Sequence, residues 1–301
     1  MIYKSRTEAI ELLILKSLNN RMDLSEKEKQ HYVSLKKGYE GELLFDTLTE
    51  KLQCDCLILN DLLLKNNSTL FQIDSLIITS DTIFLYEVKN YEGDYFYETD
   101  KLYIKPKTEI SNPLTQLSRC ESLLRQLLLN QGFTLPIDAS VIFINPEFTL
   151  YQAPLNKPII LPTQVNRHMN KLNLHPSRIT SKHKMLADKL VNLHIPVSPY
   201  NTLPLFDYCQ LRKGVFCEIC NSFSISVEGQ KCVCKECWHE ELVANAVMRN
   251  VREFRLLFPE RRITTNIVHE WCQVIDSKKR IKRILERHFK IVGVRQWAYY
   301  V

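Results

Sequence analysis

The sequence lacks any apolar stretch that approaches the ~20 residues needed to span a bilayer, and it has no repeats or low-complexity tracts. Near its start, Glu8, Glu11 and Lys16 interrupt the apolar residues of segment 7–18. This pattern predicts an amphipathic helix rather than a signal peptide. We therefore expect a soluble protein of the cytoplasm that has no membrane partner.

Charge is also unevenly distributed. The chain has 301 residues, enough for about two domains of ordinary size, and 45% of them are hydrophobic, which allows real cores. Its net charge is +6, but residues 241–301 hold thirteen Lys and Arg against six Asp and Glu. Residues 1–240 are then close to neutral. A basic excess confined to the last fifth of the chain predicts that this part binds nucleic acid.

The most informative local pattern is a pair of strands joined by a short turn. Residues 71–79 and 82–90 carry the β-branched and aromatic side chains that strands favour. A turn centred on the polar dipeptide between them places Asp74 opposite Glu87, with Lys89 on the same side. Facing side chains of an antiparallel pair have Cβ atoms about 4.5–5.5 Å apart. The register therefore predicts two carboxylates and an ammonium in one place.

Two carboxylates this close repel each other, and one pKa should rise unless they share a cation. Mg²⁺ and Mn²⁺ suit such a place, because these hard ions bind one or two carboxylates and complete their shells with water and phosphate. Asp74 and Glu87 are therefore candidate ligands for Mg²⁺ or Mn²⁺. A structural ion pair at a sheet edge would use the same residue types, so this alternative stays open.

The spacing Asp-x12-Glu-x-Lys resembles the PD-(D/E)XK nuclease superfamily, and a wider set of motifs resembles its nuclease-related domain, called NERD. The motifs occur in order over about residues 36–170: Gly38-Tyr-Glu-Gly41-Glu42, Leu59-Asn60-Asp61-Leu62, Gln72-Ile73-Asp74, Tyr86-Glu87-Val88-Lys89-Asn90-Tyr91-Glu92-Gly93 and Asn112-Pro113-Leu114-Thr115-Gln116. Ile73 stands where the superfamily has the proline of its name. The resemblance implies an α/β, restriction-endonuclease-like mixed sheet flanked by helices.

The resemblance also implies roles for five residues. Asp74 and Glu87 would be the metal ligands, and Lys89 would stabilise the hydroxide or the transition state. Glu42 and Gln116 would lie beside them as supporting polar groups. These roles describe a hydrolase that cleaves phosphodiesters with a divalent metal.

Two glycines precede Glu42 in a predicted helix. A helix is predicted at residues 25–52, and Gly38 and Gly41 inside it each cost about 1 kcal/mol relative to alanine. Such glycines indicate that the helix closely approaches a strand or a ligand. A half-buried Glu42 would require a metal or a lysine as its partner. An exposed helix glutamate is the alternative.

A second helix is predicted where Asn112 is followed by Pro113, a capping residue and then proline at the first helical position. Its apolar stripe is Leu117, Cys120, Leu124, Leu127 and Leu128. Gln116 lies at the border of this stripe. It would either reach the site or face water.

Cysteines define a further region. They are Cys217, Cys220, Cys234 and Cys237, in the pattern Cys-x2-Cys-x13-Cys-x2-Cys. Two such pairs supply the tetrahedral thiolate set that zinc prefers, and the residues between them fit a hairpin around Gly229. We predict a zinc ribbon at 209–239 with a structural Zn²⁺, because four thiolates leave no open position. Cys232 could replace Cys234, Cys209 and His239 are weaker candidates, and free or disulfide-bonded cysteines are the alternative.

The C-terminal segment resembles a helix-turn-helix. Thr264 or Thr265 would cap the first helix, residues 272–276 would form the turn, and Ser277 would cap the second helix. A strand at 294–301 would follow as half a wing. The basic residues of the second helix are Lys278, Lys279, Arg280, Lys282, Arg283 and Arg287. They are candidates for phosphate contact, and the alternative is a helix that packs on the ribbon and exposes a solvated basic face.

Together these patterns predict a nuclease-like domain at 1–193, a Pro-rich linker at 194–208, the zinc ribbon at 209–239 and a basic helical domain at 240–301. The leading functional hypothesis is a metal-dependent nuclease that acts on DNA and is targeted by its C-terminal domains. The alternative is a non-catalytic DNA-binding or regulatory protein that keeps the nuclease-like fold as a scaffold, since fold does not guarantee chemistry.

Overall fold

A computed structural model describes residues 1–294 and 297–301, which form two compact units. The N-terminal unit comprises Met1–Ala9 and Val33–Asn201, and the C-terminal unit comprises Ile10–Tyr32 and Thr202–Val301. The second crossing between the units, after Asn201, falls within the segment predicted as a linker. Residues 10–32, which the sequence places in the nuclease-like domain, group with the C-terminal unit. The finer domain boundaries stay predictions. No helix in the described part of the chain is long and apolar enough to cross a membrane.

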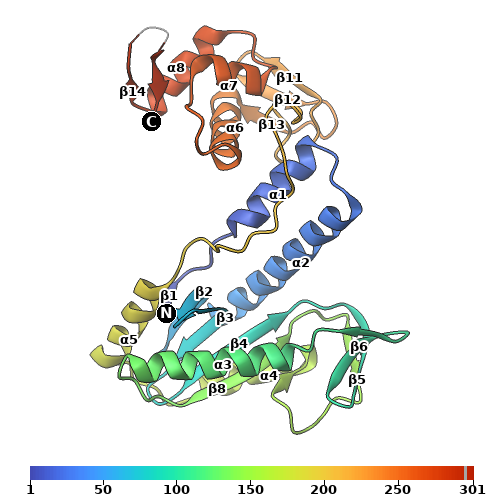
Figure 1. Cartoon of the computed structure of the whole chain (residues 1–301), viewed down its shortest axis with the longest axis vertical. Coiled ribbons are helices and arrows are strands. Elements are labelled where there is room, and N and C mark those ends of the chain that lie inside the picture. The colour runs from blue at the N-terminus through green and yellow to red at the C-terminus, as the bar shows by residue number, and fades with distance from the viewer. Residues whose placement is uncertain (295–296) are drawn as a thin grey trace. The chain divides into compact units, whose positions relative to one another are not determined.

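A six-stranded mixed sheet is the centre of the N-terminal unit, with strand order β1-β2-β3-β4-β8-β10 (Figure 1). Its strands are β1 (Ile2–Lys4), β2 (Leu57–Asn66), β3 (Thr69–Ile78), β4 (Ile83–Lys89), β8 (Ile137–Phe143) and β10 (Ile159–Ile160). The pairs β2–β3 and β3–β4 are antiparallel, and the other neighbours are parallel. The mixed α/β fold predicted from the sequence is confirmed.

The hairpin between β3 and β4 has the predicted register. Its pairs run from Ile78–Ile83 at the turn to Ser75–Tyr86, where the pairing of the two strands ends. β4 continues to pair with β8 as far as Lys89. Asp74 and Glu87 are therefore the next residues on each strand beyond the last pair, at the point where β3 leaves β4.

Helices cover both faces of this sheet. They are α2 (Glu26–Thr49), α3 (Pro113–Asn130), α4 (Pro162–Asn173) and α5 (Ser181–Leu193). α3 and α5 pack on the face that includes Leu76 and Leu85, whereas α2 and α4 pack on the face that includes Ile77 and Tyr86. This division follows from the period-two alternation of strand side chains. A four-stranded sheet, β7-β6-β5-β9, adds to the α3 face. Its strands are β5 (Gly93–Glu98), β6 (Lys101–Ile104), β7 (Thr108–Ile110) and β9 (Phe148–Tyr151).

The C-terminal unit has its own core. Its elements are α1 (Ile10–Arg21), β11 (Ile225–Glu228), β12 (Lys231–Cys234), β13 (Glu240–Leu242), α6 (Val243–Leu257), α7 (Thr265–Cys272), α8 (Lys278–His288), β14 (Ile291–Val292) and β15 (Tyr299–Tyr300). The guanidinium of Arg21 is buried in this core, where it forms two hydrogen bonds with Glu253 and lies 4.0 Å from the ring centre of Trp271. A buried charge paired in this way ties α1 to α6 and α7.

The predicted caps of α7 and α8 are present. Thr264 Oγ1 accepts a hydrogen bond from Ile267 N, and Ser277 Oγ accepts one from Arg280 N. Between the two helices, Gln273 has a φ of +51°, so a non-glycine residue takes the left-handed position in the turn.

The single strand predicted at 294–301 is wrong. Residues 295 and 296 lie outside the described residues, and Val294 precedes them without strand structure. Only Tyr299–Tyr300 is a strand, and it pairs antiparallel with β14. The reason is Gly293, whose φ of +86° lets the chain turn directly after β14.

Candidate functional site

Asp74 and Glu87 are buried where β3 and β4 separate, with 7% and 3% of their surfaces exposed. Val88 N donates a hydrogen bond to Asp74 Oδ2 at 2.8 Å. Lys89 Nζ lies 2.6 Å from Glu87 Oε1, so the two groups form a buried ion pair. One ammonium thus faces two neighbouring buried carboxylates. Such an arrangement leaves a negative charge that a further cation would stabilise.

The electrostatics of these groups are coupled. Burial raises the pKa of Asp74, and the charge of Lys89 opposes this. Burial also raises the pKa of Glu87, and the neighbouring Asp74 adds to the shift. Burial lowers the pKa of Lys89, but the two carboxylates outweigh it, so that the pKa of Lys89 is raised overall. The site therefore holds more negative charge than its own cation balances.

Glu42 reaches this region from α2, and its partner among the described side chains is an arginine. Arg6, whose side chain is 2% exposed, places Nη1 2.5 Å from Glu42 Oε2. Arg6 also binds Asp46 through Nε at 2.8 Å, and its Nη2 donates to the main-chain oxygen of Asp74 at 2.7 Å. One buried guanidinium thus joins α2 to β3 at Asp74. The lysine partner expected for Glu42 is wrong, since Arg6 takes that place. Arg6 comes from the segment after β1, far from Glu42 in the sequence.

Gln116 contacts Lys89. Asn112 caps α3 by accepting a hydrogen bond from Leu114 N, and Pro113 begins the helix as predicted. This start leaves Gln116 exposed in the first turn, where its Oε1 accepts a hydrogen bond from Lys89 Nζ at 3.2 Å. Gln116 therefore contacts Lys89 while its side chain stays exposed to water.

The family comparison covers these residues. Residues 37–144 match the family model of NERD, the nuclease-related domain. The chain contains a nuclease-related domain. No curated protein and no solved structure among those compared matches the chain. The matched segment includes Glu42, Asp74, Glu87, Lys89 and Gln116, whereas Arg6 precedes it and the cysteine ribbon follows it.

Asp61, within the segment that matches the nuclease-related domain, was not predicted from the sequence as a residue near the site. It lies in β2 with a φ of +55°, which interrupts the pairing of β2 with β3 opposite Asp74. Its negative charge raises the pKa values of Glu42 and Asp74. Lys4 Nζ donates to the main-chain oxygen of Asp61 at 2.7 Å. Asp61 stands in one of the family-like motifs, but nothing in the sequence indicates the left-handed backbone.

Gly41 brings α2 close to the end of β4. A Cβ on Gly41 would lie 2.4 Å from Cβ of Asn90, and Asn90 Nδ2 donates to Lys37 O at 2.7 Å. A Cβ on Gly38 would meet no atom within 4 Å. The predicted close approach is thus present at Gly41 and wrong at Gly38.

The carboxylates fit a divalent cation in their chemistry but are not a preassembled cluster. A metal cluster of three or more His, Cys, Asp or Glu side chains needs their ligand atoms close together. In the part of the chain that the structure describes, only the four cysteines have such atoms within 4.8 Å of one another. Mg²⁺ needs fewer protein ligands, because it keeps several waters and binds one or two carboxylates. Asp74 and Glu87, two neighbouring buried carboxylates, are sufficient for that mode of binding.

The cysteines form a four-thiolate site. The sulfur atoms of Cys217, Cys220, Cys234 and Cys237 all lie within 4.8 Å of one another. The closest pairs are 3.5 Å apart, too far for a disulfide bond and near the ~3.8 Å that a tetrahedral zinc with bonds of about 2.3 Å requires. Cys232 is not a member of this set, since it is buried in the core of the C-terminal unit. Cys209 is exposed outside the set, and His239 contacts Glu218 instead.

Proposed function

We propose that this protein is a metal-dependent nuclease that cleaves DNA phosphodiesters at Asp74, Glu87 and Lys89. The observation that carries this proposal is that two buried carboxylates, Asp74 and Glu87, lie with one ammonium, Lys89, at the end of two strands in the segment that matches the nuclease-related domain. A structural ion pair would need only one carboxylate for that ammonium. The second buried carboxylate beside it favours a bound cation.

Each residue has a role in this proposal. Asp74 and Glu87 would hold Mg²⁺ or Mn²⁺, which when bound neutralises charge on a phosphodiester and lowers the pKa of water. The raised pKa of Lys89 keeps its ammonium charged, so this group offers electrostatic stabilisation to the phosphate. Gln116 Oε1 holds the ammonium from the α3 side. Arg6 fixes Glu42 and the main chain of Asp74, so it is a positioning residue.

The test is incubation of the purified full chain with labelled single- and double-stranded DNA and RNA, with and without Mg²⁺ or Mn²⁺. Asp74→Asn, Glu87→Gln and Lys89→Met should each lower cleavage by about 10³-fold or more, because several kcal/mol of charge stabilisation is lost. Glu109→Gln is the matched control, since Glu109 forms an exposed ion pair with Lys101. The proposal fails if all three site variants cleave as well as the parent.

The C-terminal unit would deliver the nuclease to DNA. We propose that its four thiolates hold a structural Zn²⁺ and that α8 contacts phosphates. Of the six candidate cations, Arg280 is half-buried and the other five are exposed. Lys278 donates to Asn266, and Lys282 pairs weakly with Glu286 at 3.6 Å. Exposed cations on one capped helix support phosphate contact without indicating any sequence preference.

The exposed cations of α8 favour a second candidate function, a DNA-binding or regulatory protein without catalysis. Replacing Lys279, Arg283 and Arg287 with glutamine should weaken duplex binding and flatten the slope of log affinity against log salt by about 0.9 for each phosphate that is no longer neutralised. Binding that depends on α8, in a protein inert toward every nucleic acid and metal, would favour this second function. An unchanged salt slope would mean that the basic face of α8 is only solvated.

A further inference from the structure

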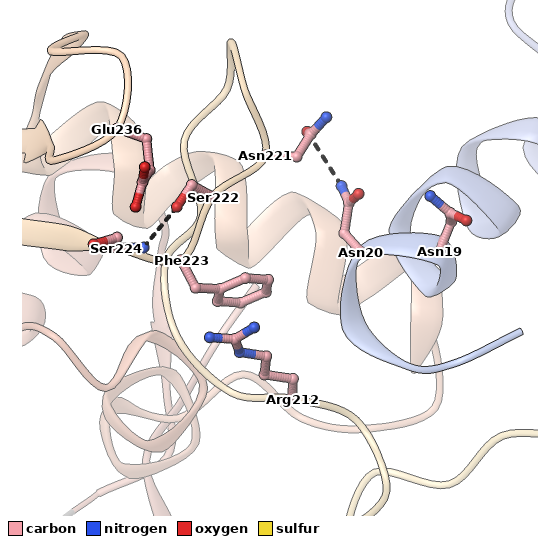
Figure 2. A pocket seen from close by; sticks show the side chains of 8 residues that line it. All are labelled: Asn19, Asn20, Arg212, Asn221, Ser222, Phe223, Ser224 and Glu236. Carbon is pink, nitrogen blue, oxygen red and sulfur yellow. Dashed lines mark hydrogen bonds between the residues drawn. The ribbon is translucent and has the colours of Figure 1, made fainter.

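A polar pocket lies beside the four-cysteine site, within the C-terminal unit (Figure 2). Its volume is about 590 Å³, which is within the usual range for small-ligand sites. The lining consists of three amides, two hydroxyls, one guanidinium, one carboxylate and one aromatic ring. None of these groups belongs to the nuclease site or to the basic face of α8.

One wall of the pocket is held by the cysteine turn. Asn221 directly follows Cys220 and has a φ of +59°, and its N–H donates to Cys217 O at 3.0 Å. In return, Cys217 N donates to Ser222 O at 2.8 Å. A metal on the four thiolates would fix this turn, so Asn221 and Ser222 would be presented on a rigid backbone.

The pocket contains a flat stacking surface. The guanidinium carbon of Arg212 lies 4.1 Å from the ring centre of Phe223, and Figure 2 shows the guanidinium beside the ring. The Arg212 side chain has no hydrogen bond or ion pair among the described residues. Its donors are therefore available to a ligand. Bases of single strands stack on aromatic rings and on arginine planes in this way.

The rim carries both donors and acceptors. Asn20 Nδ2 donates to Asn221 Oδ1 at 3.3 Å, which leaves the carbonyl of Asn20 and the NH₂ of Asn221 for a ligand. Glu236 can accept hydrogen bonds, and its charge offsets that of Arg212. A pocket with no net charge disfavours phosphate groups and acidic peptides. It suits a neutral, planar ligand with polar edges, which is the description of a nucleobase.

We propose that this pocket binds one unpaired base of a single-stranded nucleic acid. The proposal rests on the nucleic-acid binding in the proposed function, but not on cleavage. A base within a duplex is paired and stacked, so only an unpaired base can enter. The pocket would thus make the C-terminal unit selective for single-stranded regions, in addition to the phosphate contacts of α8.

The test measures binding of the full chain carrying Glu87→Gln, without added divalent metal, to a short single-stranded oligonucleotide. An abasic oligonucleotide with the same number of phosphates is the reference ligand. The base-containing strand should bind about 5- to 150-fold more tightly, which is the gain in affinity expected from stacking one base. Arg212→Ala should reduce this ratio, and so should Asn221→Gly, in which glycine tolerates the positive φ.

Lys235→Ala is the matched control, because Lys235 is an exposed cation of the same ribbon that does not line the pocket. It should leave the ratio unchanged. Metal content and circular dichroism should match the parent in every variant scored. A ratio near one in the parent, or an unchanged ratio in both pocket variants, would overturn the proposal and leave the pocket to another neutral ligand, such as a peptide.

A parallel titration with a free nucleoside separates the two sources of a base. Weaker nucleoside binding that is also abolished in Arg212→Ala supports a base presented by a strand. A nucleoside that binds as tightly as the oligonucleotide would overturn the strand as the ligand. No step of the test needs cleavage. The binding result can therefore be interpreted even if the nuclease site is inactive.

Discussion

The two candidate metal sites of this protein differ in how far apart their parts lie along the chain. The four cysteines lie within 21 residues, as two pairs on short turns, and their sulfurs meet within 4.8 Å. The carboxylate site draws Asp74 and Glu87 from a hairpin, but Glu42 from α2 and Arg6 from the segment after β1. The thiolate site therefore depends on local structure and on its metal, whereas the carboxylate site depends on the packing of the whole N-terminal unit.

The largest effect is expected when two ligands of the thiolate site are removed. Cys220→Ser together with Cys237→Ser should abolish metal binding and unfold the ribbon, because structural zinc contributes about 10–16 kcal/mol in small zinc domains. All three tryptophans lie in the C-terminal unit, so their fluorescence reports on it. Hydrogen exchange of β3 and β4 should stay protected. Cys209→Ser is the control, since Cys209 is exposed and outside the cluster. Elemental analysis that finds no metal in the parent, purified under reducing conditions, would refute this prediction.

A smaller effect is expected at Arg6. Removing one partner of a buried ion pair costs about 3–5 kcal/mol, so Arg6→Ala should destabilise the N-terminal unit by that amount in denaturant unfolding followed by hydrogen exchange. Arg125→Ala is the matched control, because the Arg125–Glu121 pair is exposed and contributes about 0.5 kcal/mol or less.

Arg6→Lys tests positioning apart from stability. Lysine keeps the charge but cannot reproduce the contacts of the guanidinium to Glu42, Asp46 and Asp74 O. In the proposed nuclease, the Mg²⁺ concentration for half-maximal cleavage should rise in this variant, even at temperatures where the protein is fully folded. If Arg6→Lys leaves this concentration unchanged, Arg6 only stabilises the fold.

The same contrast explains what could be predicted from the sequence. The cysteine spacing, the caps of α3, α7 and α8, and the register of β3 with β4 depend on residues close in the chain, and the structure has all of them. Arg6 lies 36 residues before Glu42 and 68 before Asp74, and no periodicity links them. The positive φ of Asp61 likewise follows from no local pattern in the sequence. Features set by residues close in the chain could be predicted from the sequence. The contacts that tertiary packing creates between distant residues could not.

The smallest expected effect concerns the two glycines of α2, which the sequence could not distinguish. Gly41→Ala would place a Cβ 2.4 Å from Cβ of Asn90, so α2 or the end of β4 must shift. Overpacking of this kind costs about 1–3 kcal/mol. Gly38→Ala has free space and should stabilise the helix by up to about 1 kcal/mol. Thermal unfolding of the two variants under one condition gives the comparison directly.

Because Asn90 directly follows Lys89, Gly41→Ala should also lower cleavage by the proposed nuclease, whereas Gly38→Ala should not. Equal stability of the two variants would mean that the close approach of α2 to β4 does not constrain the site.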